Sequence, residues 1–418
     1  MITHEHIQKL KALHNQYKSH IIIHPIMTGG IIPNEVQKKL IEEEWIRIGY
    51  SVCFDCIEGR SSLIAHPPIR EFLSQIAEFY GGDTAEHTFG CRAAQFAVMK
   101  TIADYIESEG SSDFTKVVVV DPLCHYTTVI ASEMAGLRLV EPPNSGYPEY
   151  RVEAKDFAEK IESIKKETGK LPGLIAVTHV EPYYGNMNPV KEIGKIAKEW
   201  DIPYMVNAAY TGGVLPIDMK DFQADFLTIS AHKSMASLGP LGFLVTTYEW
   251  AKKVFKRSVI VPEWSGRAFG KKLPNLFGCS IGGIALVSAM YSFPYVVERV
   301  KKWDAELEKT RWFIEEMEKI DDIMLIGERP HRHHLMHFET PIFWEISKRH
   351  KRKGFFLSDE MIERKVVGLH RGLSKHIKLS VYGLSWDKVK IVRDAFYEIA
   401  EKYIKAFNLE LKHPKSIS

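Results

Sequence analysis

Short apolar runs alternate with amphipathic helical stretches from about residue 115 to residue 247, and this alternation constrains the fold more than any other feature. The stretches 154–168 and 190–200 carry apolar residues at helical spacing, whereas the runs between them are typical of buried strands. Such a pattern predicts an α/β fold, in which helices cover a mostly parallel sheet. The predicted strands are 117–121, 174–178, 204–207, 226–230 and 242–246.

The pattern changes after Cys279, where we expect a long charged helix over 292–320, then shorter strands and helices, and a last helix over 386–407. We therefore divide the 418 residues into a helical arm (1–20), a large domain (21–291) and a small C-terminal α+β domain (292–418). The chain is long enough for a large core and a second, smaller one.

Composition excludes several classes of protein. No apolar run reaches about 18 residues and the first 20 residues are polar, so we expect a cytoplasmic protein with no membrane partner. Five cysteines are an odd number, which argues against a disulfide framework and leaves thiol chemistry or metal binding open. The net charge is only +2, so a nucleic-acid partner would need a local basic patch. The run 348–353 could supply one, although such runs are usually solvated faces.

A histidine-rich tract covers residues 330–337 and contains four histidines. Its spacing matches no standard zinc pattern. We expect a solvated or substrate-facing loop there, and no metal.

In a sheet of this kind, ligands bind beyond the carboxyl ends of the strands. The polar residues that follow the predicted strand ends are therefore the candidate site: His125, Tyr126, His179, Asn207 and the turn 230–233. In that turn an apolar strand runs into Ser230-Ala231-His232-Lys233. A lysine in this position can lose part of its water, which favours the neutral amine that forms imines. A lone lysine would more often be an ordinary surface residue, but this context resembles the cofactor-lysine segment of fold-type I pyridoxal 5′-phosphate (PLP) enzymes. The resemblance implies a Schiff base between PLP and Lys233.

Two further segments support this interpretation. The turn 88–92 contains Gly90 and Arg92 and leads into a predicted helix over 93–109, whose amino end would suit a phosphate. Taken alone, this turn could be a simple helix cap. Asn207 ends a strand 26 residues before Lys233, where fold-type I enzymes usually place an acid beneath the pyridine nitrogen. An amide cannot hold that nitrogen protonated, so the ring would be a weaker electron sink.

Over roughly residues 21–410 the chain resembles the archaeal O-phosphoseryl-tRNA:cysteinyl-tRNA synthases. The matching stretches are 50–60 with Cys53 and Cys56, 90–92, 125–126, 207–210, 230–236, 276–279 with Cys279, and 378–383. The resemblance implies a homodimer that acts on phosphoseryl-tRNA(Cys), with a possible phosphoseryl-tRNA synthetase complex. It implies that PLP is contacted by Cys91, Arg92, His125, Asn207, Ser230, Ala231, His232 and Lys233.

The reaction of that family implies a role for each of these residues. Lys233 would remove the Cα proton of phosphoserine, phosphate would leave from Cβ, and sulfur would add to give cysteinyl-tRNA. His125 would stack on the ring or orient the substrate. We assign sulfur relay, through a persulfide, to Cys53, Cys56 and Cys279, because a Cys-x-x-Cys pair can provide a thiolate and resolve a persulfide. The same three cysteines could instead bind zinc or an iron–sulfur cluster.

Three features depart from the family pattern: Cys91 replaces a small residue, 24–30 has an unusual sequence, and 259–275 is longer than expected. Cys124 is expected to be a small buried residue. Two alternatives remain: a PLP cysteine desulfurase or selenocysteine lyase that acts on a free amino acid, and a non-catalytic scaffold that binds tRNA or a synthetase.

Overall fold

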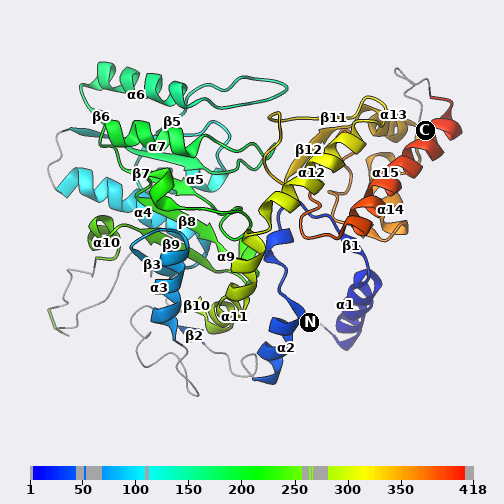
Figure 1. Cartoon of the computed structure of the whole chain (residues 1–418), viewed down its shortest axis with the longest axis horizontal. Coiled ribbons are helices and arrows are strands. Elements are labelled where there is room, and N and C mark those ends of the chain that lie inside the picture. Colours follow the sequence, from blue (N-terminus) through cyan, green and yellow to red (C-terminus); the bar gives the residue numbers. More distant parts are fainter. Residues whose placement is uncertain are drawn as a thin grey trace. The chain divides into compact units, whose positions relative to one another are not determined.

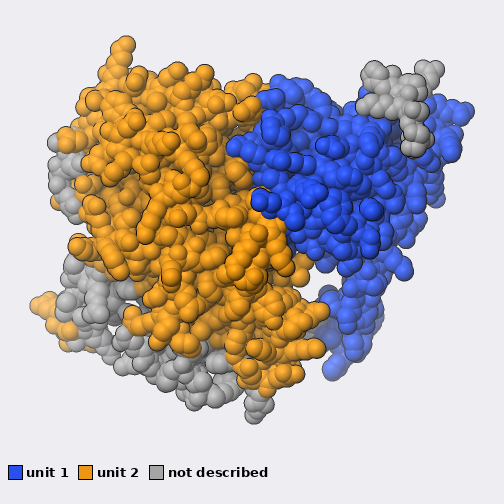
Figure 2. Space-filling view, viewed as in Figure 1, with its two compact units in different colours: residues 1–28, 147–149, 304–418 blue, residues 29–146, 150–303 orange. Residues whose placement is uncertain are grey.

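The computed structural model describes residues 3–43, 51–52, 68–108, 113–256, 263–264, 266 and 281–409. The chain forms two compact units, and Figure 2 colours them separately. Unit 1 comprises residues 1–28, 147–149 and 304–418, and unit 2 comprises residues 29–146 and 150–303. The sequence-based division at residues 20 and 291 stays a prediction beside this partition.

Unit 2 is built on a seven-stranded sheet of order β3-β9-β8-β7-β6-β4-β5 (Figure 1). The strands are β3 (Thr84–Thr88), β4 (Phe114–Val120), β5 (Arg138–Val140), β6 (Leu171–Thr178), β7 (Tyr204–Asn207), β8 (Phe226–Ser230) and β9 (Gly242–Thr246). The five strands from β8 to β5 are parallel, and β9 pairs antiparallel with both β8 and β3. The five strands expected from the sequence all lie in this sheet, and the prediction of a mostly parallel sheet is confirmed.

Helices pack on the sheet through small and branched apolar side chains. The helices of unit 2 are α2 (Asn34–Glu42), α3 (Ile69–Phe79), α4 (Gly90–Ser108), α5 (Tyr126–Met134), α6 (Ala154–Thr168), α7 (Val190–Glu199), α8 (Met219–Phe222), α9 (Ala231–Ser234), α10 (Tyr248–Val254) and α11 (Gly283–Val300). Helix α4 packs against β4, β6, β8 and β9. Its buried Ala97 and Val98 share a core with Leu174 and Ala176 of β6. Because side chains alternate along a strand, Ile175 of β6 points to the other face of the sheet.

A short 3-10 turn, η1 (Thr28–Gly30), precedes α2, and two short strands, β2 (Ser51–Val52) and β10 (Ile281–Gly282), pair antiparallel. No helix in the described part of the chain is both long and apolar enough to span a bilayer.

Unit 1 has its own core around the three-stranded antiparallel sheet β11-β12-β14. Its elements are α1 (His4–Tyr17), β1 (Ile21–Ile22), α12 (Trp303–Met317), β11 (Met324–Leu325), β12 (Met336–Glu339), α13 (Pro341–Arg349), η3 (Lys353–Phe355), α14 (Phe356–Glu363), β13 (Val366–Val367), β14 (His376–Leu379) and α15 (Trp386–Phe407). Strands β1 and β13 pair in parallel. Helix α1 buries none of its residues, as a separate arm would, and α15 matches the predicted last helix.

Two expectations for the C-terminal region are wrong. The single helix predicted over 292–320 is two helices, α11 and α12, which a turn at Lys301 and Lys302 separates. The histidine tract is not a solvated loop, because His331, His333 and His334 are buried, and the substrate-facing alternative stays a prediction. The rings of His333 and His334 stack with centroids 4.2 Å apart, and His334 Nδ1 lies 2.8 Å from Ser380 Oγ. The described residues contain no group of three or more His, Cys, Asp or Glu that could hold a metal ion.

Candidate active site

Four parallel strands end side by side at the carboxyl edge of the sheet in unit 2. Thr178 of β6 is in register with Asn207 of β7, and Asn207 is in register with Thr228 of β8. The main chain continues this contact past the strand ends, since His179 N–H donates to the Asn207 carbonyl (3.0 Å). The predicted site residues that follow β6, β7 and β8 are therefore neighbours.

Lys233 lies on α9, the single helical turn that follows β8 (Figure 1). Its side chain is half-buried. No hydrogen bond or ion pair joins its amine to any side chain that the structure describes, so a partly desolvated cation lacks a counter-charge. Such a lysine is available for chemistry rather than used for structure.

Arg299 of α11 fixes the turn that carries this lysine. Its guanidinium donates from Nη2 to the carbonyls of Ser234 and Gly29 (2.8 Å to Gly29) and from Nε to the carbonyl of Gly213 (2.7 Å). Three segments that are distant in sequence thus meet on one side chain. Such charge-assisted hydrogen bonds are stronger than neutral ones.

Glycine at positions 29 and 30 permits this close approach. A Cβ atom added to Gly30 would lie 2.1 Å from the His232 carbonyl oxygen, and one added to Gly29 would lie 2.8 Å from that of Lys233. Both distances are shorter than any real contact of a Cβ. The Gly29-Gly30 pair in the unusual 24–30 segment therefore has a structural reason.

Asn207 is buried at the end of β7, and its two amide atoms differ in their contacts. Its Oδ1 accepts from Ala209 N–H (3.1 Å) and lies 3.4 Å from Cys91 Sγ. Its Nδ2 donates to no group in the described part of the chain. An amide N–H₂ without an acceptor suits a ligand atom that accepts a hydrogen bond, as an unprotonated pyridine nitrogen does.

Cys91 lies beside Asn207, and its surroundings explain the departure from a smaller residue. Its Sγ lies 3.4 Å from Thr228 Oγ1 and accepts a hydrogen bond from Gln95 Nε2 (3.4 Å). Burial raises the pKa of this thiol, and hydrogen bonds from Thr228 and Gln95 and the charge of Lys233 oppose that rise. These contacts support a role for Cys91 in positioning Asn207 rather than in the reaction itself.

Helix α4 points its amino end at the same edge. It starts at Gly90, whose φ of +81° is readily reached only by glycine, and Thr88 Oγ1 donates to the Gly90 carbonyl (3.0 Å). The 19-residue helix leaves its first backbone N–H groups for an anion such as phosphate. Arg92 in the first turn donates from Nη2 to Tyr126 Oη (2.6 Å).

His125 caps helix α5 and is held in place by Thr127. Its Nδ1 accepts from Thr127 N–H (3.3 Å) and lies 2.8 Å from Thr127 Oγ1. Burial, followed by the charges of Lys233 and Arg92, lowers the pKa of His125 to about 4, so the ring is neutral at pH 7. A neutral imidazole can stack on an aromatic ring or accept a proton.

His232 and Ser230 belong to the lysine turn. The Ser230 hydroxyl lies 3.3 Å from His232 Nε2, and His232 Nδ1 lies 3.1 Å from the Leu241 carbonyl. Burial lowers the pKa of His232, with a smaller opposing contribution from the Leu241 hydrogen bond. Ala231 is buried and begins the turn.

Asp121 is a residue of this edge that the sequence interpretation did not use. It is fully buried after β4, and its Oδ1 accepts from Thr178 N–H (2.7 Å). Its Oδ2 has no partner in the described part of the chain. Burial raises the pKa of Asp121 to about 7, against hydrogen bonds from Thr178. A predicted strand end marked its position, but the missing partner could only be seen in the fold.

These groups fit PLP, the cofactor that the sequence predicts. Lys233 supplies an amine without a counter-charge, Asn207 supplies an unused amide donor, and the amino end of α4 supplies N–H groups for a phosphate.

The remaining cysteine predictions have different outcomes. Cys53, Cys56 and Cys279 lie outside the described residues, as does most of 259–275. Cys124 is buried in the core of unit 2, which confirms its prediction, and burial raises its pKa well above the ordinary value.

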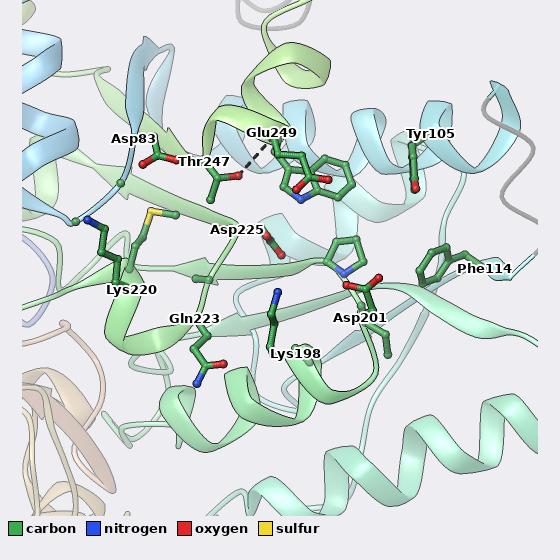
Figure 3. A pocket seen from close by; sticks show the side chains of 18 residues that line it. Asp83, Tyr105, Phe114, Lys198, Asp201, Lys220, Gln223, Asp225, Thr247 and Glu249 are labelled. Atoms are coloured by element: carbon green, nitrogen blue, oxygen red, sulfur yellow. Dashed lines mark hydrogen bonds between the residues drawn. The ribbon is translucent and has the colours of Figure 1, made fainter.

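A cavity of about 370 Å³ lies at the opposite, amino edge of the sheet (Figure 3). Its lining includes Asp225, Lys198 and Trp250. None of the predicted site residues lines it, so this cavity is not the candidate active site.

Comparisons with known proteins converge on one family. Residues 150–347 match the family model for class-V aminotransferases. The chain is 47% identical over 387 residues to O-phospho-L-seryl-tRNA:Cys-tRNA synthase 2 of Archaeoglobus fulgidus, which covers 92% of this chain and 95% of that protein. The solved SepCysS–SepCysE N-terminal domain complex is 40% identical, with a TM-score of 0.82, and covers 96% of this chain and 100% of that one.

A cysteine desulfurase from Thermococcus onnurineus NA1 is 17% identical with a TM-score of 0.72, covering 96% of this chain and 99% of that one. This likeness concerns the fold alone. The family model and these folds confirm a PLP enzyme of fold type I.

Proposed function

Because this chain belongs to the O-phospho-L-seryl-tRNA:Cys-tRNA synthase family, we propose that its carboxyl-edge residues convert phosphoseryl-tRNA(Cys) to cysteinyl-tRNA(Cys) with PLP. The observation that carries the proposal is the identity of 47% across 92% of the chain. The free-amino-acid alternative rests on likeness of fold only. The scaffold alternative would require the loss of a cofactor residue, and the sequence shows no such loss.

The residues that hold the cofactor follow from their contacts. We assign its phosphate to the amino end of α4 with Ser230 and its ring nitrogen to Asn207 Nδ2. Bound PLP supplies an electron sink that eases loss of the Cα proton and departure of phosphate from Cβ.

The chain's own groups handle the proton and orient the substrate. The Lys233 amine removes the proton from Cα and can return it, because no counter-ion among the described residues holds the amine. The charges of Lys233 and Arg92 both act on the pKa of His125, which supports a role for its neutral ring beside the substrate. Arg92 presents a fixed cation to the substrate phosphate, and Tyr126 holds the guanidinium.

Sulfur delivery is assigned to Cys53, Cys56 and Cys279. Each is replaced singly by serine, and phosphate release and cysteine formation from phosphoseryl-tRNA are measured separately with a protein-bound sulfur source. Phosphate release should persist while cysteine formation collapses, because elimination needs no thiol but sulfur addition needs a thiolate or persulfide. Parent-rate cysteine formation in all three variants would exclude the relay. Joint loss of folding or PLP would favour a structural metal site instead.

We also propose a homodimer. Its support is the solvent-facing apolar side of α5, where Tyr126, Val129, Ile130 and Met134 are exposed at helical spacing. Tyr126 lies on this apolar side of α5 and also accepts a hydrogen bond from Arg92 of the candidate active site. A second copy of the chain packed on α5 would therefore complete that site. Light scattering should report a dimer for the parent and a monomer for Val129→Lys/Ile130→Lys; a monomeric parent would refute the proposal.

Further partners and the location follow by analogy. A related protein has been solved with the SepCysE N-terminal domain, and we propose that this chain also works in a complex that includes phosphoseryl-tRNA synthetase, in the cytoplasm.

One experiment tests the reaction as a whole. Purified protein is incubated with phosphoseryl-tRNA and sulfide, the tRNA ester is hydrolysed, and the amino acid is identified by mass spectrometry. Cysteine is the expected product. Free cysteine with an added thiol reductant is the parallel arm: formation of alanine, with the persulfide sulfur reduced to sulfide by that thiol, and no product from phosphoseryl-tRNA, would replace this function by a desulfurase.

A further inference from the structure

An exposed aromatic ring in unit 1 is flanked by two arginines. Phe355, at the end of η3, is 46% exposed. The guanidinium carbons of Arg352 and Arg371 lie 6.0 Å and 5.8 Å from the centre of its ring. Cations at this distance interact with the ring face, so the ring and both arginines act as one unit.

One carboxylate orients both arginines. Arg352 Nε lies 2.9 Å from Asp359 Oδ2, and Arg371 Nη2 lies 3.0 Å from Asp359 Oδ1. These are the ion pairs that their guanidinium groups form, and each guanidinium has five N–H donors. Most of these donors therefore have no partner among the residues that the structure describes. A single negative charge between two positive charges reduces the conformational freedom of the arginines but does not neutralise them.

The backbone beneath the ring is closely packed, which fixes the two segments together. A Cβ atom added to Gly354 would lie 2.2 Å from the Gly372 carbonyl oxygen, and Gly372 itself has a φ of +86°. Only glycine at residue 354 lets η3 lie against the turn at 372. The arginine pair is thus held by the fold rather than by chance surface rotamers.

Further cations surround this unit. Lys351 and Lys353 are exposed on either side of Arg352. On the adjoining helix α13, Trp344 is 40% exposed and Lys348 lies 5.5 Å from its ring centre. We call the set Lys351, Arg352, Lys353, Phe355, Asp359 and Arg371 the Phe355 platform. It carries four cations and one carboxylate, whereas the whole chain has a net charge of only +2.

We propose that the Phe355 platform binds the sugar–phosphate backbone of the tRNA substrate. This inference rests on the proposed function, which supplies an RNA. Arginine forks match phosphate oxygens in a bidentate manner, and oriented arginines lose less entropy on binding than free ones. The exposed edges of Phe355 and Trp344 add apolar surface for ribose or an unpaired base. An acidic protein surface could also pair with the four cations, but it would not need the exposed rings.

The test measures binding of an uncharged tRNA(Cys) transcript by fluorescence anisotropy at several salt concentrations. The variant is Arg352→Gln/Arg371→Gln in the full-length protein. The matched control is Lys388→Gln/Lys390→Gln, which removes two exposed cations from α15 in the same unit. We expect the double-arginine variant to bind about 10- to 100-fold more weakly and its salt slope to fall by about 1 to 2, the value for two lost phosphate contacts. The control should stay within about 2-fold of the parent.

A third variant separates geometry from charge. Arg352→Lys/Arg371→Lys keeps both charges but loses the forks, so its affinity should fall between those of the parent and the glutamine variant. Turnover of a phosphoseryl ester of a short acceptor-end oligonucleotide should be unchanged in all variants, which excludes general damage to the fold.

Parent-like tRNA affinity and salt slope in the glutamine variant would overturn the platform while leaving the proposed function intact. Failure of the parent protein to bind tRNA at all would instead count against the proposed function. Retained tRNA binding together with lost binding of a phosphoseryl-tRNA synthetase would overturn the RNA assignment in favour of an acidic protein partner.

Discussion

A partly buried carboxyl group and a fully buried one lie at opposite edges of the same sheet and have different partners. Asp225, at the amino edge, accepts from Tyr204 N–H (2.8 Å) and from Trp250. Asp121, at the carboxyl edge, accepts at Oδ1 and leaves Oδ2 without a partner in the described part of the chain. Burial raises the pKa of both, to about 6 for Asp225 and about 7 for Asp121.

The neighbouring groups follow the same division. At the amino edge, Asp83 accepts from Tyr248 N–H (2.9 Å), and Thr247 Oγ1 accepts from Trp250 N–H to cap α10 (3.4 Å). At the carboxyl edge, the Lys233 amine and Asn207 Nδ2 have no partners among the described residues. Because unpaired buried polar groups are costly, a fold retains them where a ligand will pair them. This difference supports the proposal that the carboxyl edge carries the chemistry.

The largest expected effect on turnover comes from replacing one lysine at each edge of the sheet by alanine. Lys233→Ala should reduce turnover by at least about 1000-fold, because it removes both the imine-forming amine and the base. Borohydride reduction and mass spectrometry should then find no PLP attached to the chain. Lys198→Ala, in the lining of the amino-edge cavity, should leave turnover unchanged. Equal losses in the two variants would break the comparison between the edges.

The next effect sharpens the assignment of Asn207. Asn207→Asp should keep PLP bound but slow turnover by about 10-fold, the cost of roughly 1.4 kcal/mol in a transition-state interaction. The reason is that a carboxylate would favour a protonated ring nitrogen, whereas the amide donates to an unprotonated one. The pH dependence of the visible cofactor spectrum is the direct measurement. A spectrum that titrates as in the parent protein would remove Asn207 from the ring nitrogen.

A smaller effect is expected from Arg299, which supports the carboxyl edge without touching the reacting atoms. Arg299→Gln should slow turnover about 3- to 10-fold and shift the cofactor spectrum, because the lysine turn loses its charge-assisted hydrogen bonds. Arg299→Lys should restore part of both, since it keeps one cationic donor. A loss of thermal stability with an unchanged kcat and spectrum would mean that Arg299 is only structural.

Arg299 also shows where prediction from the sequence ends. The strands of the central sheet were predictable, because burial leaves a local pattern, and the assignment of Lys233 rests on the resemblance of its strand-end turn to PLP enzymes. The three acceptors of Arg299 are main-chain carbonyls, which any residue offers, so no sequence pattern marks them. Asp121 and Gln95 were missed for a related reason, since their partners come from neighbouring strands and helices.

Errors in the predicted elements have similar causes. Strands β3 and β5 lie at the outer edges of the sheet and were not predicted. Strand β3 is mostly buried but its sequence, TAEHT, is polar, and β5 has only three residues, none of them buried. The helix predicted over 292–320 has no glycine or proline at Lys301 and Lys302, so its break gave no local signal. His331, His333 and His334 are polar residues in the sequence, yet each is buried with one ring nitrogen hydrogen-bonded, and the rings of His333 and His334 stack.

The smallest effect concerns stability alone and lies at the amino edge. The pKa of Asp225 is about 6 in the fold, because burial outweighs the hydrogen bond from Tyr204, against an ordinary value of 3.8. The folded state therefore holds this proton more tightly than the unfolded chain does. Stability from this group is complete below about pH 4 and is lost as the pH rises to about 6.

Asp225→Asn should remove that pH dependence. Relative to the parent protein, the fall in unfolding free energy between pH 4 and pH 7 should shrink by up to about 3 kcal/mol, the equivalent of roughly two pKa units. The constant cost of an altered hydrogen bond to Trp250 cancels in this difference. Urea unfolding at both pH values measures it, and kcat should stay at the parent value because the residue lies away from the chemistry. A reduced kcat with an unchanged pH slope would place a catalytic role at the amino edge and invert the comparison.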